Sequence, residues 1–142
     1  DVHVIHELDR HKTGVTCVAF SKDDKFAISG SRGGGVVVWP IKPAITTETV
    51  LEGHHTNAIT AVIMIYDNEV VISGSEDKSI LVWEMKSATV IRSLLGGHSK
   101  GITCLGFVQS SSQHLLLSGS KDKTIILWEA HPREHTRAIP GL

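Results

Sequence analysis

The stretch Ser118–Trp128 reads SGSKDKTIILW, and it decides the fold because the chain contains the same phrase three times. The other copies are SGSRGGGVVVW at Ser29–Trp39 and SGSEDKSILVW at Ser73–Trp83. The three closing tryptophans lie 44 and 45 residues apart. A fixed period of this length is typical of repeat proteins, in which each repeat is one small unit that buries its apolar surface against its neighbours. We therefore expect three similar stacked units, with a binding surface as the default function.

Short runs rich in valine and isoleucine alternate with polar turn residues along the whole chain, which is the pattern of β-strands. No helical periodicity of useful length is present. The runs Ile80–Val82 and Ile125–Leu127 are apolar at successive positions, as in strands that are buried on both faces. The pattern predicts four strands in each repeat and a thirteenth near Thr136: Val2–Leu8, Val15–Phe20, Lys25–Gly30 and Gly35–Trp39; Glu48–Leu51, Ile59–Ile65, Glu69–Gly74 and Ser79–Glu84; Thr89–Leu95, Ile102–Phe107, His114–Gly119 and Thr124–Glu129.

A second marker precedes the second strand of each repeat: Gly53-His54 and Gly97-His98, with His11 at the same place in the first repeat. With these markers the chain resembles the WD-repeat family of β-propellers, over residues 1 to about 129. The resemblance implies an all-β fold of propeller blades, built from three four-stranded antiparallel WD repeats. We expect a single propeller segment over residues 1–142. Repeat 1 spans about 1–40, repeat 2 about 46–84 and repeat 3 about 88–129; residues 130–142 form a tail or the start of the next outer strand.

The resemblance also implies one buried hydrogen-bonded network per repeat, made of a histidine, a serine, a tryptophan and an aspartate. The second repeat has one extra residue, so His54 and His55 compete for the histidine position, and Gly33 stands where the first repeat should have its aspartate. A buried tryptophan must place its single N–H donor, and a neutral histidine can accept at one nitrogen while it donates at the other. The network residues are His11, Ser29 and Trp39; His54, Ser73, Asp77 and Trp83; and His98, Ser118, Asp122 and Trp128.

Three blades cannot close a ring, because known propellers take about four to eight. The flat apolar faces of the two end blades would then stay open, and large exposed apolar patches mark contact sites or aggregation risk. We therefore expect further propeller blades, either from a longer chain or from homo-oligomerisation, in which two copies would give six blades. We favour a longer chain with close to seven blades. The chain also lacks an initiator methionine, which agrees with a processed or excised piece.

In propellers of this family, partners often bind the face that carries the loops before the second strand and the turns between the third and fourth strands. By that resemblance, three charged residues of different sign are exposed in the turns, and six small residues adjoin them. A surface of mixed charge suits a protein or peptide with patterned charge and argues against phosphate backbones. The partner-binding candidates are Arg32, Glu76, Lys121, Gly14, Thr16, Ala58, Thr60, Gly101 and Thr103.

Composition excludes several other classes. The formal net charge is −1, which gives no bulk attraction to nucleic acid or to a membrane surface, and no apolar run is long enough to cross a bilayer. The two cysteines, Cys17 and Cys104, occupy equivalent positions of different repeats, so we expect free thiols and a reducing, intracellular (cytoplasmic) setting. We expect no cofactor. The segment His131–His135 matches the H-x-x-E-H pattern of zinc peptidases, but it lacks the surrounding helix, so we expect no metal site there.

These observations together predict a protein–protein interaction scaffold with no catalytic residues of its own. The first alternative is a sensor or autoinhibitory propeller domain of a larger signalling protein. An enzyme or a nucleic-acid binder that uses the propeller mouth is the remaining alternative, and it would need non-repeated functional residues that converge there. The sequence does not identify the partner, the parent protein, the pathway or the number of copies.

Overall fold

The computed structural model describes residues 2–110 and 112–130, and over this range it contains eleven β-strands and no helix. Apart from the first predicted strand, each strand begins and ends within two residues of its expected bounds. The strands are β1 (Val15–Phe20), β2 (Phe26–Ser31), β3 (Val36–Pro40), β4 (Thr49–Leu51), β5 (Ile59–Ile65), β6 (Val70–Ser75), β7 (Ile80–Glu84), β8 (Thr89–Leu94), β9 (Ile102–Gln109), β10 (His114–Ser120) and β11 (Ile125–Ala130).

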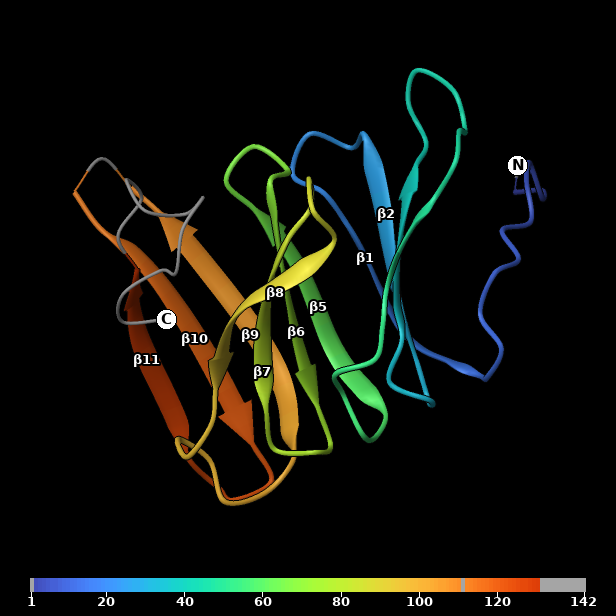
Figure 1. The fold of residues 1–142 in the computed structure, drawn as a ribbon. Coiled ribbons are helices and arrows are strands. Elements are labelled where there is room, and N and C mark those ends of the chain that lie inside the picture. The colour runs from blue at the N-terminus through green and yellow to red at the C-terminus, as the bar shows by residue number, and fades with distance from the viewer. Residues whose placement is uncertain (1, 111, 131–142) are drawn as a thin grey trace.

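The strands form three antiparallel sheets that stand side by side, from blue through green to red in Figure 1. The first sheet has the order β1-β2-β3-β4, the second β5-β6-β7-β8 and the third β9-β10-β11. One apolar cluster lies between the first and second sheets and includes Ile28 and Trp83. Another lies between the second and third sheets and includes Ile72 and Leu116. The predicted fold class, all-β propeller blades in an incomplete ring, is confirmed.

The segment predicted as the first strand, Val2–Leu8, is not a strand. Its apolar side chains Val2, Val4 and Ile5 are at least 84% exposed. The sheet order gives the reason. The outer strands β4 and β8 follow the tryptophan in the chain, and they pair with β3 and β7 of the sheet that precedes them. Each four-stranded sheet is therefore completed by the first strand of the next sequence repeat, a shift of one strand. Val2–Leu8 would need the third strand of a preceding sheet, and the described residues contain no such strand.

The third sheet shows the same shift at the other end. It has three strands instead of the four that were predicted, because its outer strand would have to follow β11. The candidate for that strand, near Thr136, lies outside the described residues, as do the tail from 131 to 142 and the H-x-x-E-H segment.

A β-bulge at the start of each inner strand links one sheet to the next. Thr16 and Thr60 are the extra residues of the bulges in β1 and β5. A bulge can turn a side chain out of its normal direction. The Thr16 hydroxyl donates to the carbonyl of Ile59 (2.5 Å), and the Thr60 hydroxyl donates to the carbonyl of Ile102 (2.5 Å). Each hydroxyl thus reaches the inner strand of the following sheet.

The glycine of each Ser-Gly-Ser phrase makes room for that same neighbour. A Cβ on Gly74 would lie 2.6 Å from Cγ2 of Ile102, and a Cβ on Gly30 would overlap Ile59 in the same way. Real Cβ atoms do not approach that closely. The repeated glycine is therefore required by close packing between sheets, since Ile59 and Ile102 rest directly on the backbone of the preceding sheet.

Equivalent positions of the second and third sheets differ in how far they are buried. Ile72, on the face of the second sheet that meets the third, is completely buried, whereas its counterpart Leu117 in the third sheet is 43% exposed. Ile80 and Val82 are at most 1% exposed, whereas their counterparts Ile125 and Leu127 are 72% and 62% exposed. The outer face of the third sheet therefore has the apolar pattern of a covered surface, but among the described residues no further sheet covers it.

The difference between covered and uncovered positions predicts different costs for matched substitutions. In this 142-residue chain, Ile72→Ala should lower the free energy of unfolding by about 2–5 kcal/mol, as large-to-small changes in a packed core do. Leu117→Ala should cost about 1 kcal/mol or less, because that side chain is already partly in water. Urea unfolding of both variants measures this, and equal costs in this chain would contradict the assignment of the open face.

Candidate functional site

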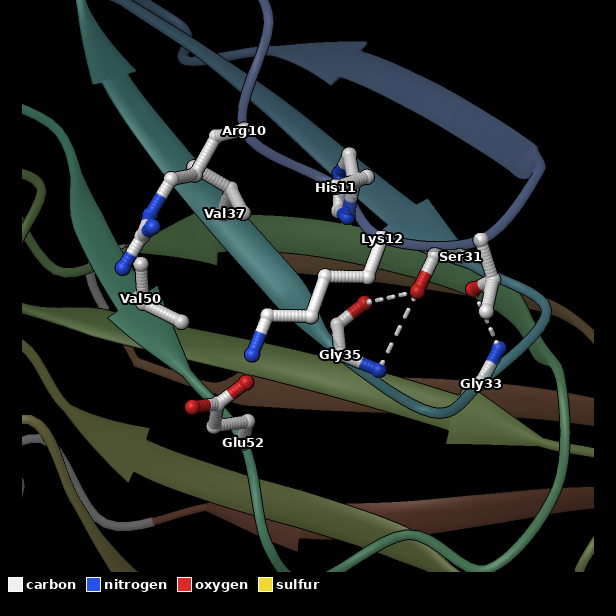
Figure 2. Close-up of a pocket in the computed structure, with 10 residues that line it drawn as sticks. Arg10, His11, Lys12, Ser31, Gly33, Gly35, Val37, Val50 and Glu52 are labelled. Atoms are coloured by element: carbon white, nitrogen blue, oxygen red, sulfur yellow. Dashed lines mark hydrogen bonds between the residues drawn. The ribbon is translucent and has the colours of Figure 1, made fainter.

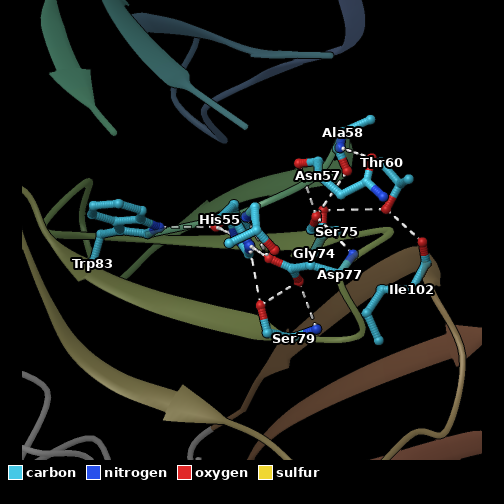
Figure 3. Close-up of polar contacts among 12 residues, drawn as sticks. His55, Asn57, Ala58, Thr60, Gly74, Ser75, Asp77, Ser79, Trp83 and Ile102 are labelled. Atoms are coloured by element: carbon cyan, nitrogen blue, oxygen red, sulfur yellow. Dashed lines mark hydrogen bonds and ion pairs between the residues drawn. The ribbon is translucent and has the colours of Figure 1, made fainter. Parts of the chain in front are cut away.

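The second repeat contains a complete network of buried polar side chains (Figure 3). Trp83 Nε1–H donates to Ser73 Oγ (2.8 Å), and the same oxygen lies 2.7 Å from His55 Nε2. On its other side, His55 Nδ1 lies 2.8 Å from Asp77 Oδ2. Asp77 also accepts from the backbone N–H groups of Thr56 (3.1 Å) and Ser79 (2.8 Å). The network therefore ties the loop before β5 to strands β6 and β7 and to the turn between them.

The chemistry of these groups sets the direction of each hydrogen bond. An ionised carboxylate only accepts, so His55 carries its proton on Nδ1 and donates it to Asp77. The neutral ring then accepts at Nε2 from the hydroxyl of Ser73, whose oxygen accepts from Trp83. Each polar side-chain atom of this network therefore has at least one partner of the right kind. If His55 were also protonated on Nε2, that nitrogen could no longer accept the hydroxyl proton of Ser73.

The third repeat has the same arrangement, and the first repeat has part of it. His98 joins Ser118 (2.8 Å) and Asp122 (3.0 Å), and Trp128 donates to Ser118 (2.9 Å). In the first repeat, His11 and Trp39 meet at Ser29, at 2.6 and 2.9 Å. Gly33 provides no carboxylate there. The structure thus brings together the predicted residues of each network, with one correction.

The correction concerns the histidine of the second repeat, which is His55 and not His54. His55 is buried, whereas His54 is exposed and meets Trp83 edge-on with ring centroids 5.5 Å apart. The one-residue insertion moves the Gly-His marker away from the network position, so the residue after the marker takes the role. Sequence analysis also missed Ser79 and Thr124, whose hydroxyls donate to Asp77 and Asp122. Both lie two residues after the aspartate, and this shared spacing was a signal that could have identified them.

Burial and hydrogen bonding shift the protonation equilibria in the network. Burial lowers the pKa of His55, and its bond to Asp77 only partly opposes this. Burial by itself would raise the pKa of Asp77, but the hydrogen bonds from Ser79, His55 and Thr56 outweigh it and lower that pKa. Hydrogen bonds also lower the pKa of Asp122, first of all the one from Thr124. In the second repeat, the stable state at neutral pH is therefore a neutral His55 beside an ionised Asp77.

The partner-binding candidates lie in turns that the backbone holds in place. In each repeat the turn residue donates its backbone N–H to the loop before the inner strand: Arg32 to Gly14 (2.8 Å), Glu76 to Ala58 (3.0 Å) and Lys121 to Gly101 (3.0 Å). The structure therefore brings six of the nine candidates together as three equivalent pairs. Gly14 and Arg32 are exposed, Ala58 and Glu76 are half-buried, and Gly101 is buried.

The other three candidates are the bulge threonines. The hydroxyls of Thr16 and Thr60 are engaged between sheets, so they serve the stacking of the blades. Thr103, their counterpart in the third sheet, is exposed, and among the described residues its hydroxyl has the sulfur of Cys104 as its one hydrogen-bond partner, at 3.6 Å.

The three turn charges are not equally free. Lys121 Nζ lies 2.8 Å from Glu76 Oε1, which is an ion pair between the third and second repeats. Within the part of the chain that the structure describes, Arg32 forms no ion pair. Arg32 is therefore the cation of this surface that remains available to a partner.

The described residues contain neither a metal-binding cluster nor a membrane-spanning helix. No group of three or more histidine, cysteine or acidic residues there could hold a metal ion. Over 2–110 and 112–130, no helix has the length and apolar character needed to span a membrane. Cys17 and Cys104 are free thiols, and burial raises the pKa of Cys17.

Comparison with known proteins agrees with this geometry. Residues 5–141 match the protein family described as the NWD2 C-terminal beta-propeller. No curated protein sequence matches the chain. Among solved structures, the WD40 repeats of RRP9 and the structure of U3-55K each superpose with a TM-score of 0.72 at 22% sequence identity. Each superposition covers 85% of this chain and 37% of the other chain, so this chain spans well under half the length of these structures.

The shared serine oxygen is the central atom of each network, and its removal should be costly. Ser73→Ala leaves the N–H of Trp83 and the Nε2 of His55 without a partner in a buried site. Unpaired buried polar groups cost about 1–3 kcal/mol each, so the free energy of unfolding should fall by at least about 1 kcal/mol. Ser87→Ala, at an exposed turn, is the control and should change little. Chemical denaturation measures both, and a loss below about 0.5 kcal/mol for Ser73→Ala would contradict the network.

The lowered pKa values predict a stability that falls in acid. The pKa of His55 is lower in the folded chain than its ordinary 6.5, so its contribution is complete above pH 6.5 and is lost as pH falls below that value. The lowered pKa of Asp77 adds a further loss as pH falls below 3.8. Unfolding free energy should therefore rise with pH through both ranges. His55→Gln should flatten the upper part of this dependence, as urea unfolding at a series of pH values would show.

Proposed function

The chain belongs to the NWD2 C-terminal beta-propeller family, and from this premise we propose that it is a protein–protein interaction scaffold with no catalysis of its own. The observation that carries the proposal is the row of three turns at Arg32, Glu76 and Lys121. Each turn is fixed to the loop beside it by the same backbone hydrogen bond, yet each presents a different side chain. Rigid scaffolds that vary side chains at equivalent loop positions are typical of recognition surfaces.

The charges of this row indicate the kind of partner. Arg32 is unpaired among the described residues, and the Glu76–Lys121 ion pair lies along the same row. A protein or peptide with an acidic group near Arg32 and a polar stretch beyond it would complement this surface. The net charge of −1 and the ion pair provide no extended basic surface, so a nucleic acid is not the partner we propose.

We further propose that the scaffold is completed by additional propeller blades from a longer chain. The apolar side chains Leu117, Ile125 and Leu127 are exposed in the third sheet, although their counterparts in the second sheet are buried by the next blade. Among the described residues, the Thr103 hydroxyl contacts the sulfur of its neighbour Cys104, whereas those of Thr16 and Thr60 each bind the following inner strand. The two solved structures compared above are also much longer than this chain. Completion by homo-oligomerisation is the alternative, and the mass of the full-length protein in solution distinguishes the two.

A second role fits one observation. The matching family is described as a C-terminal propeller, which favours attachment to other domains. In that setting the same surface could bind a domain of its own protein, as a sensor or autoinhibitory domain of a larger signalling protein does. We place either role in the reducing interior of the cell, the cytoplasm, because both cysteines are free thiols.

A charge reversal at the free cation tests the scaffold. In affinity purification of the full-length protein, Arg32→Glu should reduce the recovery of specific partners at least about tenfold, as the loss of a desolvated ion pair with its partner does. Lys86→Glu makes the same charge change in the exposed turn between β7 and β8, at the opposite end of the strands, and should retain them. Both variants should keep the wild-type melting temperature. Equal recovery with both variants would refute the binding surface.

A further inference from the structure

Two of the three repeats hold a carboxylate with the same pair of donors. In the second repeat, Oδ2 of Asp77 accepts from His55 Nδ1 (2.8 Å) and from the backbone N–H of Thr56 (3.1 Å). In the third repeat, Oδ2 of Asp122 accepts from His98 Nδ1 (3.0 Å) and from the backbone N–H of Ser99 (3.0 Å). The histidine ring and the next backbone N–H thus converge on one carboxylate oxygen.

The first repeat keeps these donors but has no carboxylate between them. His11 is held at Ser29 in the same way as the other two histidines, which fixes the direction of its ring. The backbone N–H of Lys12 corresponds to those of Thr56 and Ser99. Within residues 2–110 and 112–130, neither His11 Nδ1 nor the N–H of Lys12 has a hydrogen-bond partner. The aspartate position is Gly33, so this repeat has two oriented donors without an acceptor.

A pocket of about 220 Å³ occupies this place. A water molecule takes about 30 Å³ in the liquid, so the pocket has room for a carboxylate group and the atoms that carry it. Figure 2 shows the long side chains of Arg10 and Lys12 beside the pocket, with Glu52 on the far side from His11. Arg10 also lies 3.4 Å from Glu48. The cations favour an anion, while the two glutamates would disfavour a doubly charged one such as a phosphate monoester.

We propose that this pocket binds the carboxylate of an acidic side chain, aspartate or glutamate, from a protein partner. The occupant is inferred from this chain itself, because the same donor pair holds an aspartate in both sister repeats. The donors lie in a partly desolvated site, where charge-assisted hydrogen bonds are the strong ones. The assignment of a protein as the source rests on the proposed scaffold function, whereas the preference for a carboxylate rests on the pocket alone.

The test follows the ring resonances of His11 by NMR in the full-length protein, assigned by their absence in His11→Gln. The probes are sodium acetate and an N-acetylated, C-amidated Gly-Asp-Gly peptide, at constant ionic strength. Acetamide and the Gly-Asn-Gly peptide are the matched neutral probes. Acetate and the aspartate peptide should shift the His11 resonances saturably, and the neutral probes should not.

Two substitutions of Gly33 localise the effect. Gly33→Asp introduces the carboxylate of the sister repeats and should weaken binding of both acidic probes at least about tenfold, since the pocket is then filled. Gly33→Ala adds only a Cβ, 3.0 Å from the Thr13 hydroxyl oxygen and 3.2 Å from its methyl carbon. Gly33→Asp crowds Thr13 in the same way, so the two variants differ in the carboxylate, and Gly33→Ala should retain binding. This pair separates filling of the pocket from a mere change of backbone freedom.

Three outcomes would overturn the proposal. If no acidic probe gives a saturable shift, the pocket is not a carboxylate site. If both Gly33 variants lose binding equally, the carboxylate is not what fills it. If acetate binds and the aspartate peptide does not, the pocket admits small anions and no protein side chain. None of these results bears on the Arg32→Glu recovery experiment, so the scaffold proposal stands or fails separately.

Discussion

The structure depends on the contact between one sheet and the inner strand of the next. Ile59 and Ile102 rest on the glycines of the preceding sheet, and a bulge threonine binds the carbonyl of each of these isoleucines. Because the glycine has no side chain, the two backbones approach closely and exclude water from the apolar residues around them. The contact buries one face of each sheet, which an isolated sheet of three or four strands cannot do for itself.

The polar networks act within each sheet and determine where its loops lie. A histidine from the loop before the inner strand reaches a serine on the second strand, and through that serine a tryptophan on the third strand. In the second and third repeats an aspartate connects the same histidine to the turn. The turns that carry Glu76 and Lys121 are thereby fixed relative to the loops beside them. The same bonds that stabilise the fold therefore hold the proposed binding surface in one shape.

The first repeat differs from the other two at Gly33, which stands where they have Asp77 and Asp122. Its histidine, serine and tryptophan remain together, but Gly33 opens a pocket in place of an internal carboxylate. Loss of an internal partner costs stability, and it leaves donors that another molecule can satisfy. Arg32, one residue before Gly33, is also the turn cation without an ion pair among the described residues. The two features are adjacent, so a single acidic segment of a partner could contact both.

The sequence by itself determined the repeat, the strand positions and the residue types of the networks, because these depend on local patterns of two to about eleven residues. Tertiary structure alone decided which strand pairs with which sheet. Val2–Leu8 has the pattern of a strand yet is not one here, since an outer strand needs the third strand of a preceding blade. It also decided that His55 and not His54 enters the network, and that Thr16 and Thr60 bind a neighbouring sheet. These outcomes depend on contacts between residues from 11 to 43 positions apart, and no local pattern contains the distances between them.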